Sequence, residues 1–157
     1  MNALQISRIV LVICCLQLAA CNTIGVFEQT TAFKKQEWAG SNKPSFTFTI
    51  TDTLASYNIY VVLRHTDAYS YNNIWMKCTR RGPDTTYTQQ VDLRLATNGQ
   101  GWLGTGMDDI WEHRIPITQG PARFRKSGAY AFILEQVMRQ DPLLHVLNAG
   151  IRIEKQP

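Results

Sequence analysis

Apolar and polar residues alternate with a period of two along most of the chain, the pattern of β-strands that bury one face. Six runs rich in β-branched and aromatic residues show it: 46–50, 57–64, 73–79, 87–95, 130–137 and 147–153. Turn-forming residues cluster between the runs, at 41–44, 81–84, 98–101 and 127–128. No segment has a helical period long enough for a helix bundle. The pattern predicts an all-β fold, an antiparallel β-sandwich of the jelly-roll or immunoglobulin-like kind.

The run 73–79 separates buried from exposed positions. Cys78 is in step with Ile74 and Met76, which predicts a buried, inert thiol rather than a catalytic one. Trp75 is out of step with them and is expected to face solvent or a second layer. For the remaining tryptophans, Trp38, Trp102 and Trp111, core packing is the favoured interpretation. Stacking of flat aromatic rings on sugars leaves glycan binding as the alternative.

The first residues follow a different pattern. Arg8 precedes an apolar stretch at 9–18, and residues 18–21 read Leu-Ala-Ala-Cys, a lipobox. This predicts a lipoprotein signal peptide at 1–20, with Cys21 as the lipid attachment site. The apolar stretch is too short to span a membrane. The alternative is an ordinary secretory signal cleaved after Ala20.

The predicted mature chain has a short linker at 21–25 and one β-sandwich domain at 26–157. Residues 22–25, the four after Cys21, reach only about 14 Å when extended, so the domain should lie close to the bilayer. About 135 residues can bury a hydrophobic core without disulfide bonds or a structural metal ion. Cys78 is the one cysteine left once Cys21 is lipidated, so no intramolecular disulfide is expected.

The formal net charge of +4 is modest and falls by one without Arg8. The densest basic groups are Arg80-Arg81 and residues 123–126, which we interpret as solvated turn charges. Nucleic-acid binding is improbable for an exported protein. Contact with anionic lipid headgroups remains open, because the domain is tethered beside them.

The most distinctive internal segment is 101–110. Its glycines follow the order G-x-x-G-x-G without a helix pattern behind them, so they do not form a phosphate-binding fingerprint. A bend or bulge is favoured, where glycine permits positive φ and close backbone approach. If the segment binds a partner instead, the candidate residues are Trp102, Gly104, Thr105, Gly106 and Asp109.

Polar clusters give no clear catalytic or metal site. Asp108 and Asp109, with Glu112 and His113, suggest a metal or acid–base site, but adjacent aspartates on a strand point to opposite faces. Either aspartate with Glu135 would supply the two carboxylates of a glycoside hydrolase, but nothing in the sequence sets their separation. The three histidines, His65, His113 and His145, show no ligand spacing. We therefore expect no catalytic residue, metal or cofactor.

Several stretches in combination resemble the gliding-motility-associated lipoprotein GldH family of Bacteroidetes. They are the lipobox, Trp102–Gly106 with Asp109-Ile110, the middle stretch 57–61 leading to Leu63-Arg64 and Tyr69, and the C-terminal blocks 128–132, 135–139 and 150–154. The resemblance covers nearly the whole predicted mature chain. Family members tend to carry glycine where this chain has Asp108, and also near His145.

The resemblance implies a lipid-anchored protein needed for gliding motility and linked to type IX secretion of surface adhesins. It carries no catalytic assignment. We therefore expect a non-enzymatic protein that binds other envelope proteins, anchored in the outer membrane and facing the periplasm. A glycan-binding envelope lipoprotein is the alternative.

Overall fold

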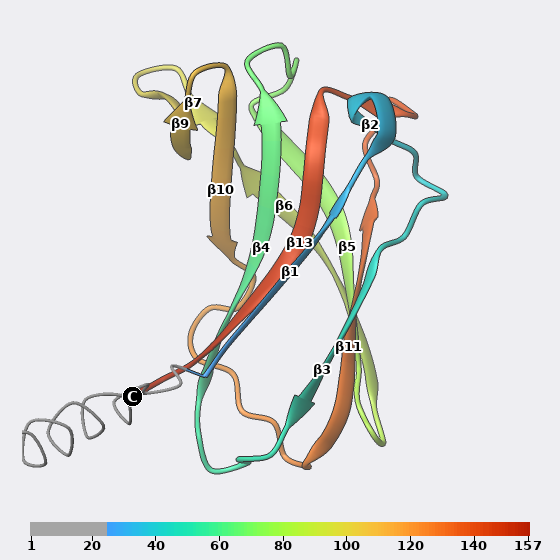
Figure 1. Cartoon of the computed structure of the whole chain (residues 1–157), viewed down its shortest axis with the longest axis vertical. Helices are drawn as coiled ribbons and strands as arrows, with labels where there is room; N and C mark the ends of the chain where they lie inside the picture. Colours follow the sequence, from blue (N-terminus) through green and yellow to red (C-terminus); the bar gives the residue numbers. More distant parts are fainter. Residues whose placement is uncertain (1–24) are drawn as a thin grey trace, which may run out of the picture.

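The computed structural model describes residues 25–157, which form two antiparallel β-sheets packed face to face (Figure 1). The signal peptide and Cys21 lie outside these residues. In spatial order, the first sheet holds β1 (Val26–Ala32), β13 (Val146–Lys155), β4 (Tyr57–Thr66), β10 (Ile110–Pro116) and β9 (Thr105–Met107). The second holds β3 (Ser45–Ile50), β11 (Gly128–Gln136), β5 (Asn73–Arg81) and β6 (Thr86–Arg94).

Short elements complete the ends of the sandwich. A 3₁₀ turn, η2 (Lys34–Gln36), precedes β2 (Glu37–Trp38), which pairs with β12 (Leu143–Leu144). Strands β7 (Ala96–Thr97) and β8 (Gly101–Trp102) form a small hairpin. In the described part of the chain, no helix is long and apolar enough to cross a bilayer.

The strand pairing is that of a jelly roll. The first long strand pairs with the last (β1 with β13), the second with the second-last (β3 with β11) and the third with the third-last (β4 with β10). The two middle strands, β5 and β6, pair as a hairpin. Of the two sandwich types that the alternation left open, the structure therefore selects the jelly roll.

Alternation along the strands fills the space between the sheets, as the sequence predicted. In β3, Phe46, Phe48 and Ile50 are buried while the intervening residues are exposed. Cys78 is buried on the inner face of β5 beside Ile74 and Met76, and Trp75 on the opposite face is 40% exposed. Both expectations for this strand are confirmed.

Two positions depart from the predicted faces. The register of β13 shifts between Val146 and Asn148, so Val146 enters the core and Leu147 is only half-buried. A bulge of this kind cannot be read from alternation, because it breaks the period of two. Tyr87 shares the face of Val91 and Leu93 in the alternating run 87–95, but it is exposed near the start of β6, which is the edge strand of its sheet.

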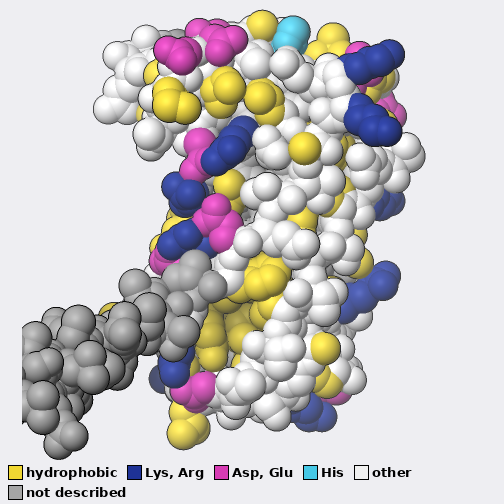
Figure 2. Space-filling model, in the orientation of Figure 1, with side chains coloured by type: hydrophobic (Ala, Val, Ile, Leu, Met, Phe, Trp, Pro, Cys, Tyr) yellow, Lys and Arg dark blue, Asp and Glu magenta, His cyan; other side chains and the backbone are white. Residues whose placement is uncertain are grey.

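The outer face of the first sheet carries a row of ion-paired side chains (Figure 2), which we call the charge ladder. It consists of Glu28, Arg64, Glu112, Arg114 and Arg152. Arg114 on β10 binds Glu112 at 2.7 Å and reaches Glu28 on β1 at 3.4 Å. Because β4 and β13 lie between these strands, its side chain must pass over their register neighbours, Val62 and Gly150. This explains why Val62 is buried although it is on the outer face.

One end of the sandwich contains Gly25, the first described residue, and the other end lies opposite it. We call the end formed by Gly25 and the loops 51–56, 82–85 and 117–127 the tether end. The opposite, distal end carries the loops 67–72, 95–109 and 137–145 (Figure 1).

Candidate functional site

The segment singled out in the sequence, 101–110, lies at the distal end and provides the edge strand β9. β9 pairs with β10 on one side, through Thr105 opposite Glu112, and is the last strand of its sheet on the other. All three residues of β9 are exposed. Leu103 is 44% exposed and Met107 is 75% exposed, so apolar side chains flank this edge. We call Leu103, Thr105 and Met107 the distal edge.

The candidate residues of this segment do not converge on one point. Trp102 is half-buried and packs on the ring of His65, with centroids 4.4 Å apart. Thr105 and Asp109 are exposed, and the backbone carbonyl of Asp109 accepts a hydrogen bond of 2.9 Å from the amide of Asp67. Gly104 and Thr105 line an open cleft of about 430 Å³ together with Arg94, Glu112 and His113, whereas Trp102, Gly106 and Asp109 lie outside it.

Gly104 and Gly106 are needed for close packing. A Cβ atom on Gly104 would lie 2.4 Å from the carbonyl oxygen of Glu112, and one on Gly106 would lie 2.8 Å from the ring of Trp111. The expectation of close approach is thus correct for both glycines. The expectation of positive φ is correct for Gly101 (φ 67°) but not for Gly104 or Gly106, and Asp108 (φ 55°) also takes that conformation.

Beneath the segment, two histidines that the sequence left isolated form a buried pair. Nε2 of His65 on β4 lies 2.9 Å from Nε2 of His113 on β10. Nδ1 of His65 lies 2.9 Å from the carbonyl oxygen of Thr66, so this nitrogen must donate. Nε2 of His65 is therefore the acceptor, and His113 donates its Nε2–H to it. His145 contributes its backbone carbonyl to Thr66, 3.0 Å away.

The electrostatics favour the neutral form of both rings. Burial lowers the pKa of His113 to about 4, with a further contribution from His65. Burial also lowers the pKa of His65, against the smaller opposing effects of the Thr66 carbonyl and Asp67. A proton on the accepting nitrogen would break the hydrogen bond, so the lowered pKa values keep this buried pair intact at neutral pH.

The other polar candidates are separated by the fold. Glu112 points outward into the charge ladder whereas its neighbour His113 points into the core. Glu135 lies on the other sheet and binds Lys43 at 3.1 Å. Among residues 25–157, no three His, Cys, Asp or Glu side chains gather as a metal site would require. Burial raises the pKa of Cys78 to about 12, which keeps the thiol protonated.

The tryptophans do not assemble a sugar-binding platform in the described chain. Trp38 is fully buried and stacks on Phe33, with centroids 4.8 Å apart. Trp111 donates its indole N–H to Asp67 at the distal end. Trp75 lies on the outer face of the other sheet, apart from Trp102. This arrangement counts against the glycan-binding alternative.

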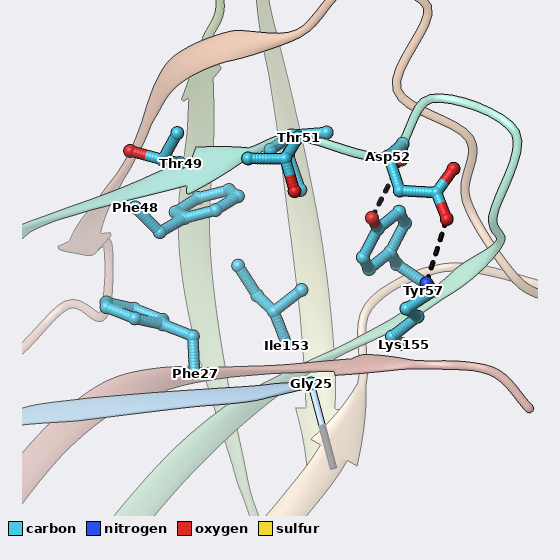
Figure 3. A pocket seen from close by; sticks show the side chains of 10 residues that line it. Gly25, Phe27, Phe48, Thr49, Thr51, Asp52, Tyr57, Ile153 and Lys155 are labelled. Atoms are coloured by element: carbon cyan, nitrogen blue, oxygen red, sulfur yellow. Dashed lines mark hydrogen bonds and ion pairs between the residues drawn. The ribbon is translucent and has the colours of Figure 1, made fainter. Parts of the chain in front are cut away.

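A second feature, at the tether end, is an open cleft of about 380 Å³ between the two sheets. Phe27, Phe48 and Ile153 form its apolar wall (Figure 3). The ion pair of Asp52 with Lys155, 2.8 Å long, lies at its rim near Gly25. This cleft could not be predicted from the sequence, because its walls come from strands that lie together only in the folded chain.

The class of protein defined so far is an all-β jelly roll with an open edge at one end and an apolar cleft at the other. Comparison with known families identifies it further: the GldH lipoprotein family model matches residues 25–153, and the chain belongs to this family. It is therefore a cell-envelope, lipid-anchored gliding motility lipoprotein by family.

A curated relative agrees over the full length. The gliding motility lipoprotein GldH of Flavobacterium johnsoniae is 22% identical over 155 residues, which cover 94% of this chain and 95% of the relative. Among solved structures, the infectious bursal disease virus VP2 subviral particle matches 83% of this chain at 16% identity and a TM-score of 0.36. The chain spans about a third of that VP2 chain, 32% of its length.

Proposed function

We propose that this protein supports gliding motility, and the associated type IX secretion of surface proteins, through non-enzymatic contacts with other envelope proteins. In this proposal a lipid on Cys21 holds it in the outer membrane, facing the periplasm. The family membership supports the motility role. The distal edge is the observation that supports protein contact, because an exposed edge strand flanked by apolar side chains is a surface that a partner can cover.

The position of the distal edge suits this role. Strand β1 begins at the tether end, and β9 lies at the opposite end of the sandwich (Figure 1). A partner that binds the distal edge would therefore meet the side of the domain that is turned away from the anchor. Gly104 packs closely against the backbone of Glu112, and His65 bonds to His113 beneath this segment. Both contacts would hold the distal edge in one conformation.

Complementation tests the proposal. A gliding bacterium that lacks its own family member receives either the parent chain or the double variant Leu103→Ser and Met107→Ser. We expect the parent to restore colony spreading and adhesin secretion, and the double variant to accumulate normally without restoring either. Trp75→Ser, which removes an exposed apolar side chain from another face, is the matched control and should restore both.

Two results would contradict the proposal in different ways. Full rescue by the double variant would exclude the distal edge as the contact surface. Failure of the parent chain, despite normal accumulation and membrane attachment, would show that this member does not share the family's role in that host.

A further inference from the structure

Two basic groups that are far apart in the sequence meet at the tether end. Arg80 comes from the end of β5, and Arg123, Arg125 and Lys126 come from the loop before β11. Together with the aromatic rings of Tyr87 and Phe124 they line one pocket of about 530 Å³. The sequence had suggested separate, solvated turn charges, whereas the structure joins them in one concave surface. We call it the basic pocket.

The basic pocket keeps most of its positive charge. Lys126 is paired with Asp84 at 2.8 Å, the single carboxylate in the lining. Among the described residues, no carboxylate lies within ion-pair distance of Arg123 or Arg125, which are both exposed. Arg80 lies over the Phe124 ring, 5.7 Å from its centroid, which orients its guanidinium toward the pocket. Guanidinium groups bind phosphate oxygens in paired hydrogen bonds, so the pocket suits a phosphate.

A continuous row of backbone contacts connects this pocket to the tether. The Lys155 amide donates to the Gly25 carbonyl at 2.9 Å, Lys155 pairs with Tyr57, and Tyr57 pairs with Ala122 through hydrogen bonds of 2.8 and 2.7 Å. Three strand spacings amount to about 14 Å. Ala122 adjoins Arg123, so the basic pocket lies at the same level of the sandwich as Gly25, four residues after Cys21.

Apolar groups lie at the same end. Leu54, in the loop between β3 and β4, is 88% exposed. The apolar cleft beside Gly25 appears as a hydrophobic hollow in the lower part of Figure 2. The cleft and the basic pocket are separated by a layer of aromatic rings, with Phe48 and Phe124 5.8 Å apart. The loop of Leu54 meets the basic pocket where Arg123 donates a hydrogen bond of 3.4 Å to the Ser56 hydroxyl. An exposed apolar side chain on a loop that contacts an arginine is a combination that binds the interface of an anionic bilayer.

We infer that the tether end is a membrane-binding surface, and that the basic pocket receives the phosphate headgroup of an anionic phospholipid from the bilayer that holds the anchor. Leu54 enters the interface beside it. The inference rests on the anchor proposed at Cys21. Its consequence is a fixed orientation, in which the distal edge points away from the membrane.

The test uses the full chain with its anchor, reconstituted in vesicles of phosphatidylcholine with or without phosphatidylglycerol. A polarity-sensitive fluorophore is attached at Leu54→Cys, and a matched probe at Asn98→Cys reports the distal end. The remaining thiol, Cys78, is buried and should label slowly. We expect phosphatidylglycerol to shift the emission of the tether-end probe to the blue, with the distal probe unchanged.

Charge variants identify the pocket. Removing two arginines in Arg123→Gln with Arg125→Gln should lower the ratio of docked to undocked probe roughly 30-fold, about fivefold for each basic residue near an anionic surface. The control Lys34→Gln with Lys35→Gln removes the same charge at the distal end and should leave the ratio unchanged. Flotation with the vesicles reports the anchor separately, so loss of the anchor is distinguishable from loss of docking.

Three outcomes would overturn the inference. The first is an emission that ignores phosphatidylglycerol in a protein that floats with the vesicles. The second is an equal loss in both charge variants, which would indicate net charge rather than this pocket. The third is displacement of the docked probe by inorganic phosphate at low concentration, which would make the pocket a site for free phosphate.

Discussion

At the scale of single residues, the buried histidine pair has a consequence for stability. The ordinary histidine pKa of 6.5 holds in the unfolded chain, while the folded values of His65 and His113 are lower. Below pH 6.5 the unfolded state therefore binds more protons than the folded state. The contribution of these two histidines to the free energy of unfolding is largest above pH 6.5 and decreases as the pH falls. Acidification toward the folded pKa of His113, about 4, removes this stabilisation.

The corresponding prediction concerns the pH dependence of unfolding. Between about pH 6.5 and about pH 4, titration of His113 should lower the free energy of unfolding of the parent by up to about 1.4 kcal/mol per pH unit. His65, whose pKa burial also lowers, should add to this fall below pH 6.5. His113→Gln should reduce the slope by one proton, whatever its effect on stability at neutral pH. Urea unfolding at a series of pH values measures this slope. Parallel curves for parent and variant would show that His113 does not titrate differently on folding.

Among the described residues, Asp108 and His145 are two of four non-glycine residues whose backbone takes a conformation that favours glycine, the others being Lys35 and Gln36. Asp108 has φ 55° and His145 has φ 66°. Asp108 stands where family members tend to carry glycine, and His145 lies near the second such place, so both departures fall at or beside a left-handed backbone position. Aspartate tolerates this conformation better than histidine does, because its short side chain can bond locally.

Replacing His145 with glycine should therefore stabilise the fold. We expect His145→Gly to raise the free energy of unfolding by about 1 kcal/mol, since the strain of a side chain at positive φ exceeds the entropy cost of glycine. His145→Ala is the control, because it removes the imidazole and keeps the strained Cβ. Thermal unfolding measures both variants. A gain in the alanine variant of the same size would assign the effect to the imidazole ring instead.

At the scale of elements, the sequence predicted six of the eight long strands of the described chain but not their partners. Alternation identifies the buried face of a strand, as in β3 and β5, because the period of two is local. It says nothing about which strand lies alongside, so the pairing of β1 with β13 came only from the structure. Two long strands were missed. Strand β1 has few large apolar residues after Phe27, so it shows no clear alternation. The inward positions of β10 include His113, and a polar residue there obscures the alternation.

The same reasoning explains what was missed at the sites. The sequence identified the glycine segment, since glycines are visible without knowing the fold. The histidine pair, 48 residues apart, depends on β4 and β10 being neighbours in register, His65 opposite Trp111 and His113 opposite Leu63. The basic pocket depends on two loops meeting at one end. Long-range pairing therefore creates each of these features.

The packing of β9 on β10 gives a prediction at this scale. Gly104→Ala should cost about 1–3 kcal/mol, because the new methyl group meets a backbone oxygen that cannot rotate away. Gly106→Ala should cost less, since it meets the side chain of Trp111, which can move. Gly99→Ala has no atom within 4 Å and should stay within about 0.5 kcal/mol of the parent. Equal melting temperatures for all three variants would exclude a packing role for this segment.

At the scale of the whole molecule, the two ends of the jelly roll have different surfaces. The tether end combines the basic pocket, the apolar cleft and Leu54. The distal end carries Asp67, Asp108 and Asp109 beside the exposed Leu103 and Met107. Sandwich strands run from one end to the other, so a contact made at the membrane and a contact made with a partner need not compete for the same surface.

This division of roles requires that the chain be lipidated at Cys21. Two or three acyl chains give stable attachment, whereas one holds a protein only marginally. We expect Cys21→Ser to abolish labelling by a clickable fatty acid and to release the protein from the membrane fraction or leave its precursor uncleaved. Cys15→Ser, inside the predicted signal peptide, is the matched control and should label normally. Equal labelling of parent and Cys21→Ser would place the anchor elsewhere. The proposed orientation, with the tether end facing the bilayer, would then lack its basis.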